Sequence, residues 1–229
     1  MLRLSFPLSL HRSFPLSFSI MPALKTRKKI SLNGEPDRLG EIYRTAAEII
    51  FKQGFDATSM NDIAEAVGLT KAGIYHYIPG KKELLFTLMS YAMDHLDRQV
   101  IAPAAAIADA EMRLQHIVTN HVQLITGTGD KKGNGLLSIL TDELAGLTSA
   151  HRRKIIERKR VYLNLVRTTL EELQTEGKLK DVDTTVGAFT IFGTVMWLAR
   201  WYRPSGHLTG AQIAKEIINI VVSGMFKAT

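Results

Sequence analysis

Apolar side chains recur at helical spacing along most of the chain after residue 38. Leu39, Ile42, Ala46 and Ile50 repeat every three or four positions, and Gly54 ends the run. Similar patterns predict further helices at about 58–67, 70–77, 81–103, 109–126, 135–147, 149–177, 183–202 and 209–227, with Pro103 expected to kink or end its helix. No segment shows the alternating pattern of a half-buried strand. The sequence therefore predicts an all-α fold.

Residues 58–85 have the spacing of a helix-turn-helix. Two short helices that cross at a steep angle need a small residue at their contact, which Ala64 supplies, and Gly68 tolerates a positive φ at the turn. Either Thr58 or Ser59 can cap the first of these helices. The residues that fall on the predicted apolar seam are Ile63, Val67, Leu69, Ile74 and Tyr77.

The second helix of this motif then presents polar and small residues outward, as the DNA major groove requires. Its first turn and the Thr70 hydroxyl can hold a phosphate, and Lys71 can reach a phosphate or a guanine edge. Gly73 lets the backbone approach the bases, whereas His76 can be a DNA contact or part of the core. We expect DNA contacts from Lys28, Thr58, Thr70, Lys71, Ala72, Gly73, Tyr75, His76 and Lys81.

Charge and composition agree with a DNA partner. Lys and Arg number 29 and Asp and Glu 22, which gives a formal charge of +7. The absence of cysteine excludes thiol catalysis and thiolate metal sites. Proline, histidine and arginine interrupt the apolar residues before Met21, so we interpret 1–35 as a disordered leader and basic arm, with Met21 as an alternative start, rather than a targeting segment.

Residues 38–90 resemble the N-terminal domain of TetR-family regulators in three motifs: "QGFDATSM", "IAEAVGLTKAGIYHY" and "KKELL". Ile78 stands where the family usually has Phe, and Gly80 replaces its usual Ser-type cap. In the C-terminal half, "DELAGLTSAHRRKIIERKRVY" and "MWLARWYRPSGHLTGAQIAKEI" resemble a subgroup that regulates fatty-acid, aromatic-ring or sterol-side-chain degradation. Effectors in that subgroup are often acyl-CoA thioesters, so the resemblance implies an acyl-CoA thioester or an amphipathic organic acid as the effector.

The last two predicted helices, 183–202 and 209–227, are apolar nearly all round. A surface helix has one apolar face, so each of these needs two partners. A four-helix bundle shared by two protomers provides them, and we expect a homodimer through these helices. The residues behind this expectation are Val186, Phe189, Phe192, Val195, Met196, Ile213, Ile217, Ile220 and Val221.

Candidate ligand contacts lie in the C-terminal half. Arg160 and Arg167 follow the edge of an apolar stripe, where they can hold a carboxylate or CoA phosphates, although such charge runs are more often solvated. Trp197 and Trp201 can line a pocket or pack in the core or an interface. Asn120 is a further candidate. His116 and His121 are five residues apart, which does not suit one metal ion, so we expect no metal and no cofactor.

Together these features predict a cytoplasmic, DNA-binding transcriptional regulator, a repressor that a small molecule releases from a palindromic operator. Its predicted parts are a DNA-binding domain at 36–82 and a ligand-binding and dimerisation domain at 83–229. An enzyme is the main alternative, but no nucleophile-and-base constellation is visible. A DNA-binding protein without effector control would not need the C-terminal half. A ligand-sized cavity below the long helix would separate these possibilities.

Overall fold

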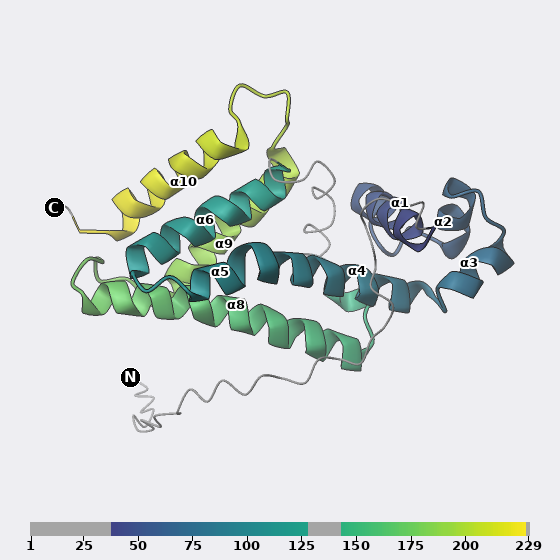
Figure 1. The fold of residues 1–229 in the computed structure, drawn as a ribbon, viewed down its shortest axis with the longest axis horizontal. Helices are drawn as coiled ribbons and strands as arrows, with labels where there is room; N and C mark the ends of the chain where they lie inside the picture. The colour runs from purple at the N-terminus through teal and green to yellow at the C-terminus, as the bar shows by residue number, and fades with distance from the viewer. Residues whose placement is uncertain (1–37, 128–142, 228–229) are drawn as a thin grey trace, which may run out of the picture.

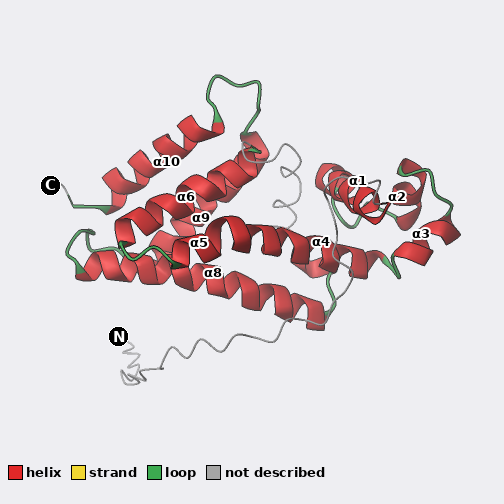
Figure 2. Ribbon diagram, in the orientation of Figure 1, coloured by secondary structure: helices red, strands yellow, loops and turns green. Residues whose placement is uncertain are grey.

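The computed structural model describes residues 38–127 and 143–227. Helices joined by loops make up this part of the chain (Figure 2), and its only β pairing is an isolated bridge between Leu179 and Phe226. The predicted all-α fold is confirmed. The expected leader and basic arm lie outside the described residues.

Three helices form a small unit at one end of the molecule: α1 (Arg38–Gln53), α2 (Met60–Ala66) and α3 (Lys71–Tyr77) (Figure 1). The periodic apolar positions of α1, including Ile42 and Ile50, are buried as predicted. Arg38 joins the start of α1 to the end of α2, because its guanidinium donates a hydrogen bond to the carbonyl oxygen of Val67. The unit thus has both an apolar core and a polar brace.

Helix α4 (Lys81–Leu96) connects this unit to the rest of the molecule. It continues through a π-helical turn, Asp97–Ile101, into α5 (Ala102–Ala105). Pro103 lies in the first turn of α5 and lacks the N–H that would bond to a carbonyl one turn earlier. The long helix therefore ends soon after Pro103, as predicted, and it widens directly before the proline.

The remaining helices form a bundle around α4: α6 (Ala110–Thr126), α8 (Ser149–Thr175), α9 (Thr184–Trp201) and α10 (Gly210–Met225). In Figure 1, α8 runs beside α4 over most of its length, and α10 covers α6 on the far side. Of the helix predicted at 135–147, only the end is described, and Glu143–Gly146 is a short 3-10 helix, η2. The α-helix predicted for this end is therefore wrong, because the residues form a 3-10 helix, and residues 135–142 lie outside the described part of the chain.

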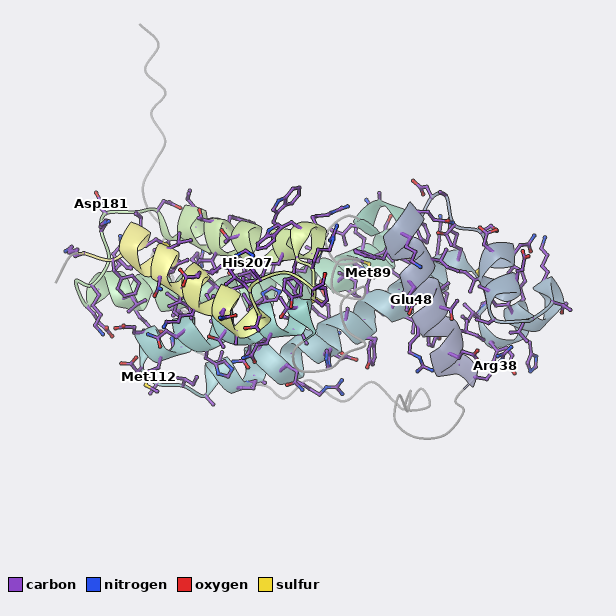
Figure 3. All side chains as sticks on the ribbon, turned by 90° about the horizontal axis from the view of Figure 1, so that it is seen from above. Arg38, Glu48, Met89, Met112, Asp181 and His207 are labelled. Atoms are coloured by element: carbon purple, nitrogen blue, oxygen red, sulfur yellow. The ribbon has the colours of Figure 1, made fainter. Side chains whose placement is uncertain are left out.

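One continuous apolar core runs through both parts of the molecule. Figure 3 shows the length of the molecule, with Arg38 and Asp181 toward opposite ends and the core residue Met89 between them. Arg113 ties α6 to α8 at the end far from α3, because its guanidinium bonds to Glu172 at 2.8 Å and to the carbonyl oxygen of Ala108 at 3.0 Å. This contact holds the bundle together at the end far from the α1–α3 unit (Figure 1).

Truncating a fully buried side chain of α8 tests this core. Leu170 has no solvent exposure, so Leu170→Ala leaves a cavity and should lower the free energy of unfolding by about 2–5 kcal/mol. The control Asn164→Ala, at an exposed position of the same helix, should change it by less than about 0.5 kcal/mol. Denaturant unfolding at one fixed protein concentration measures both, and equal effects would contradict the assigned burial.

Candidate DNA-binding surface and ligand cavity

The chain turns sharply between α2 and α3, and two local features fix the turn. Gly68 has φ +65°, a left-handed conformation that favours glycine. The amide of Leu69 donates to the carbonyl oxygen of Ala64 at 2.8 Å, and Ala64 is 2% exposed, as expected for the contact point of the two helices. The predicted helix-turn-helix geometry is present.

Each short helix starts with a side-chain cap. Ser59 and Asp62 form a reciprocal capping box on α2, with the Asp62 amide donating to Ser59 Oγ at 3.1 Å and the Ser59 amide donating to Asp62 Oδ2 at 2.8 Å. The second of these hydrogen bonds lowers the pKa of the Asp62 carboxyl group. On α3, Thr70 Oγ1 accepts a hydrogen bond from the Gly73 amide at 3.0 Å. These caps hold two seven-residue helices that would be marginal alone.

The outer face of α3 carries most of the predicted DNA contacts. Thr70, Lys71, Ala72, Tyr75 and His76 are exposed, whereas Ile74 on the opposite face is fully buried. Lys71 and Tyr75 are one helical turn apart, so they share a face. The surface combines a cation, hydroxyl groups and a helix N-terminus, which are the groups that contact DNA phosphates and base edges.

Gly73 has a structural role besides the predicted close approach to DNA. A Cβ atom built there would lie 3.2 Å from Thr70 Oγ1, which is tighter than usual. The same hydroxyl oxygen accepts the hydrogen bond of the Gly73 amide. A side chain at 73 would therefore press on the cap of α3.

Two expectations about this surface need correction. Thr58 is 1% exposed and its hydroxyl donates to the carbonyl oxygen of Gly54 at 2.8 Å, so it faces inward rather than toward DNA, and Ser59 is the cap. Tyr77 is 42% exposed and so lies outside the apolar seam, where Ile78 is buried instead. Lys81 Nζ lies 3.3 Å from the carbonyl oxygen of Asp56, and its contact with DNA stays a prediction. The predicted contact Lys28 lies outside the described residues.

Lys81 also stabilises the junction between α4 and the α1–α2 loop through an aromatic ring. Its ammonium nitrogen is 4.2 Å from the centre of the Phe55 ring, a cation–π geometry. Replacing Lys81 would therefore disturb the fold as well as any phosphate contact. Lys71, for which the described residues show no such contact, is the cleaner test of phosphate binding.

A cavity of about 440 Å³ lies below α4, among α4, α6, α8 and α9. Its walls are mainly apolar and include Leu96, Ile125, Leu163, Phe192 and Met196. The polar or charged residues that line it are His121, Lys159, Arg160 and Tyr162. The volume lies in the range of small-molecule sites, and the combination of an apolar wall and a few polar groups is typical of them.

Three aromatic rings from three helices form one wall of the cavity. Tyr162 Oη on α8 is 3.1 Å from His121 Nδ1 on α6, and the Tyr162 ring meets Phe192 of α9 edge to face with centroids 4.9 Å apart. Burial lowers the pKa of His121 to about 4 and raises the pKa of Tyr162. Both side chains are therefore neutral over the physiological range.

The predicted ligand contacts are mostly elsewhere. Arg160 lines the cavity, but Arg167 does not, and its Nε is 3.4 Å from Glu171 Oε1 on the same helix. Asn120 donates to the carbonyl oxygen of His116 and is not in the lining. Trp197 and Trp201 are exposed on the outside of α9 rather than in the cavity.

Sequence reasoning did not predict the hydrogen-bonded pair in the cavity wall. His121 entered only as a minor candidate grouped with Asn120 and His116 and was rejected as a metal ligand, and Tyr162 did not enter at all. A usable signal existed, since both stand at helical positions whose neighbours one turn away on the same face, such as Ile117 and Val166, are buried. A polar group at a core position needs a partner, and each is the partner of the other.

The expected second apolar face is present on α9, whereas on α10 Ile220 is its one member among the described large apolar side chains. On α10, Ile217 and Val221 are buried against the protomer's own core, whereas Ile220 is 67% exposed. On α9, Ile191, Val195 and Leu198 face the core, and the exposed apolar residues are Val186, Phe189, Trp197 and Trp201. We call Val186, Phe189, Trp197, Trp201 and Ile220 the outer stripe.

Fold and site together define a helix-turn-helix DNA-binding protein with a ligand-sized cavity in a helical bundle. Residues 42–88 match the family described as "Bacterial regulatory proteins, tetR family", and residues 108–225 match "Tetracyclin repressor-like, C-terminal domain". The chain therefore belongs to the TetR family and is a DNA-binding transcriptional regulator. None of the described helices is long and apolar enough to cross a membrane.

The chain is also similar over most of its length to individual proteins. It is 36% identical to AibR, solved with isovaleryl coenzyme A and operator DNA, with a TM-score of 0.73 over 80% of this chain and 97% of AibR. KstR2 of Mycobacterium tuberculosis, a ketosteroid transcriptional regulator, is 25% identical, with a TM-score of 0.75 over 85% and 98% of the two chains. The transcriptional repressor KstR2 of Rhodococcus jostii is 26% identical over 84% of this chain and 93% of its own.

Substitutions on the outer face of α3 test the DNA-binding surface. Lys71→Ala should weaken binding to every DNA sequence. It should also reduce the slope of log K against the logarithm of the salt concentration by about one, because one phosphate contact is lost. Tyr75→Ala should weaken binding to an operator selected from random DNA by about 1.5–3 kcal/mol, the range for a hydrogen bond to a charged group.

The matched control is Lys215→Ala, which removes an exposed cation from α10, far from α3 (Figure 1). Fluorescence anisotropy with labelled DNA at several salt concentrations gives all three affinities. Parental affinity in both α3 variants, or an equal loss in the control, would remove α3 from the interface.

Proposed function

We propose that the protein is a homodimeric repressor that binds a palindromic operator and releases it when an acyl-CoA thioester or an amphipathic organic acid enters the cavity. The observation that carries this proposal is the apolar cavity below α4 with two cations in its lining. A DNA-binding protein without effector control has no use for such a cavity. As part of the same proposal, the protein acts in the cytoplasm, where its operator is.

The chemistry of the cavity favours a ligand with an apolar and an anionic part. Apolar walls bury an acyl group, because each buried methylene contributes about 0.8 kcal/mol. Arg160 lies at the cavity with an exposed side chain, and within the described part of the chain no carboxylate pairs with it. It is thus available for a CoA phosphate or a carboxylate. The resemblance to AibR, solved with isovaleryl coenzyme A, supports the thioester.

The contacts between α8 and α4 give a route from the cavity to the DNA. Arg158 on α8 pairs with Asp94 of α4 at 2.7 Å, and the His151 ring stacks on Phe86 with centroids 3.9 Å apart. A ligand that displaces α8 therefore also tilts α4, which carries α3. A tilt changes the distance between the two recognition helices of a dimer. Coupling of about 1–3 kcal/mol would lower operator affinity 5- to 150-fold.

The outer stripe supports the homodimer. Its five apolar residues lie on adjacent helices of one protomer, and such patches on soluble proteins are usually interfaces. A two-fold axis through this stripe pairs α9 and α10 with their copies as a four-helix bundle. The two α3 helices would then meet half-sites about 34–36 Å apart, which is one turn of DNA.

The effector prediction uses two arginines on α8. Arg160→Ala should weaken operator release by isovaleryl-CoA several-fold, or about 1 kcal/mol for an exposed ion pair, without changing ligand-free operator binding. Arg167→Ala is the matched control, because Arg167 faces Glu171 and is absent from the cavity lining. Anisotropy of a labelled operator during titration with acyl-CoAs and free acids measures release. Release by a neutral or cationic compound alone would contradict the proposed effector class.

The dimer prediction uses the outer stripe. Trp197→Glu or Ile220→Glu should convert the dimer into folded monomers and abolish tight operator binding, because a buried unpaired carboxylate costs several kcal/mol at an interface. Lys215→Glu, an exposed position of α10, is the control and should leave the dimer intact. Sedimentation velocity and circular dichroism give mass and helicity. An unchanged dimer in both stripe variants would place the interface elsewhere.

A further inference from the structure

The cavity contains one polar pair whose hydrogen-bonding capacity exceeds what the pair uses. Tyr162 Oη and His121 Nδ1 are 3.1 Å apart and both side chains are almost fully buried. The phenol has one O–H and the neutral imidazole has one N–H. Only one of these two hydrogens can lie between Oη and Nδ1.

The other hydrogen is left over from this hydrogen bond, whichever tautomer His121 adopts. If the phenol donates to Nδ1, the imidazole carries its hydrogen on Nε2. If Nδ1 donates to the phenol oxygen, the phenolic hydrogen is left over. Among the described residues, neither Nε2 of His121 nor Tyr162 has another hydrogen-bond partner. Because both residues line the cavity, a ligand can supply the missing acceptor.

Resting on the proposed function, we infer that the His121–Tyr162 pair is a neutral donor site that binds a carbonyl oxygen in the apolar part of the ligand. A carbonyl accepts a hydrogen bond and brings no donor of its own, so it fits a wall with one spare hydrogen. The thioester carbonyl of an acyl-CoA and a ring ketone both belong to this class. A saturated hydrocarbon would leave the buried donor unsatisfied.

The charge state of the pair argues against a buried carboxylate at the same place. The pKa of His121, about 4, keeps the imidazole uncharged near neutral pH, and Tyr162 remains a phenol because burial raises its pKa. A carboxylate moved from water to this wall would lose its hydration without meeting a cation there. The cations of the lining, Lys159 and Arg160, lie on α8 one turn or less before Tyr162 and can take the anionic part.

The test compares two probes that differ in one atom, 2-octanone and 2-methyl-1-octene, in which a methylene replaces the carbonyl oxygen. Their dissociation constants are measured for the full-length protein and for the double variant His121→Leu/Tyr162→Phe, which keeps apolar bulk and removes both hydrogens. The ratio of the two constants is compared between proteins, because the different hydration of the probes then cancels. Tyr202→Phe, which removes a hydroxyl outside the cavity lining, is the control.

We expect the ratio to shift toward the alkene by about 5- to 150-fold in the double variant, which is the cost of an unmatched buried donor, and not to change in the control. A shift below twofold in a double variant that retains its helicity and operator binding would overturn the inference. So would the failure of the parent protein to bind either probe, or tighter binding of 2-octanol than of 2-octanone.

A second measurement does not depend on the folding of the variant. The carbonyl carbon of 2-octanone labelled with carbon-13 should resonate downfield of its position in hydrocarbon solvent when bound to the parent protein, as a hydrogen-bonded ketone does. A bound signal at the hydrocarbon position would overturn the inference.

Operator release separates this inference from the proposed function. Isovaleryl-CoA and its thioether analogue S-(3-methylbutyl)-CoA should differ in potency, and the difference should shrink in the double variant. If the ketone preference depends on the His121–Tyr162 pair but no CoA compound releases the operator, the proposed acyl-CoA effector is contradicted and the donor site is supported. Release by both CoA compounds with equal potency in every protein would remove the donor site and leave the effector class.

Discussion

Burial along α4 is the constraint on which both functions of the molecule depend. Seven of its side chains, Leu84, Leu85, Leu88, Met89, Ala92, Met93 and Leu96, are buried, so the helix belongs to the core of the DNA-binding unit and to that of the bundle. At the junction, Gly146 of η2 approaches so closely that an added Cβ would lie 2.4 Å from the Phe55 ring. The two parts therefore cannot move independently without opening an apolar core.

This packing makes a rigid-body movement of α4 the least costly way for the cavity to affect α3. Met93 and Leu96 line the cavity near the C-terminal end of the helix, while Leu84 and Leu85 anchor its other end. Close-packed cores resist gradual deformation and favour movement between discrete arrangements. A shift at Leu96 then reaches the DNA-binding unit as a change of helix tilt rather than as local loosening.

The sequence was most informative where a few adjacent residues determine the structure. Ala64, Gly68, the capping residues and the apolar seam together placed the helix-turn-helix, and the apolar period located most helices to within a few residues. It was least informative where the outcome depends on neighbours far along the chain. Nothing local shows that Trp197 points outward, or that Arg160 lines the cavity while Arg167 does not. The His121–Tyr162 hydrogen bond joins residues 41 positions apart, which no spacing rule reveals.

Helix α9 links the cavity to the outer stripe because it is apolar on both sides. Phe189 belongs to both, since it lines the cavity and is 58% exposed. Gly193 also lines the cavity and is exposed, and along α9 it lies between Phe189 and Trp197 of the outer stripe. A helix buried on one face could serve either a ligand or a partner. With two apolar faces, α9 connects the cavity lining directly to the outer stripe on which the proposed dimer rests. The apolar composition that made its orientation unpredictable from sequence is thus what places one helix at both surfaces.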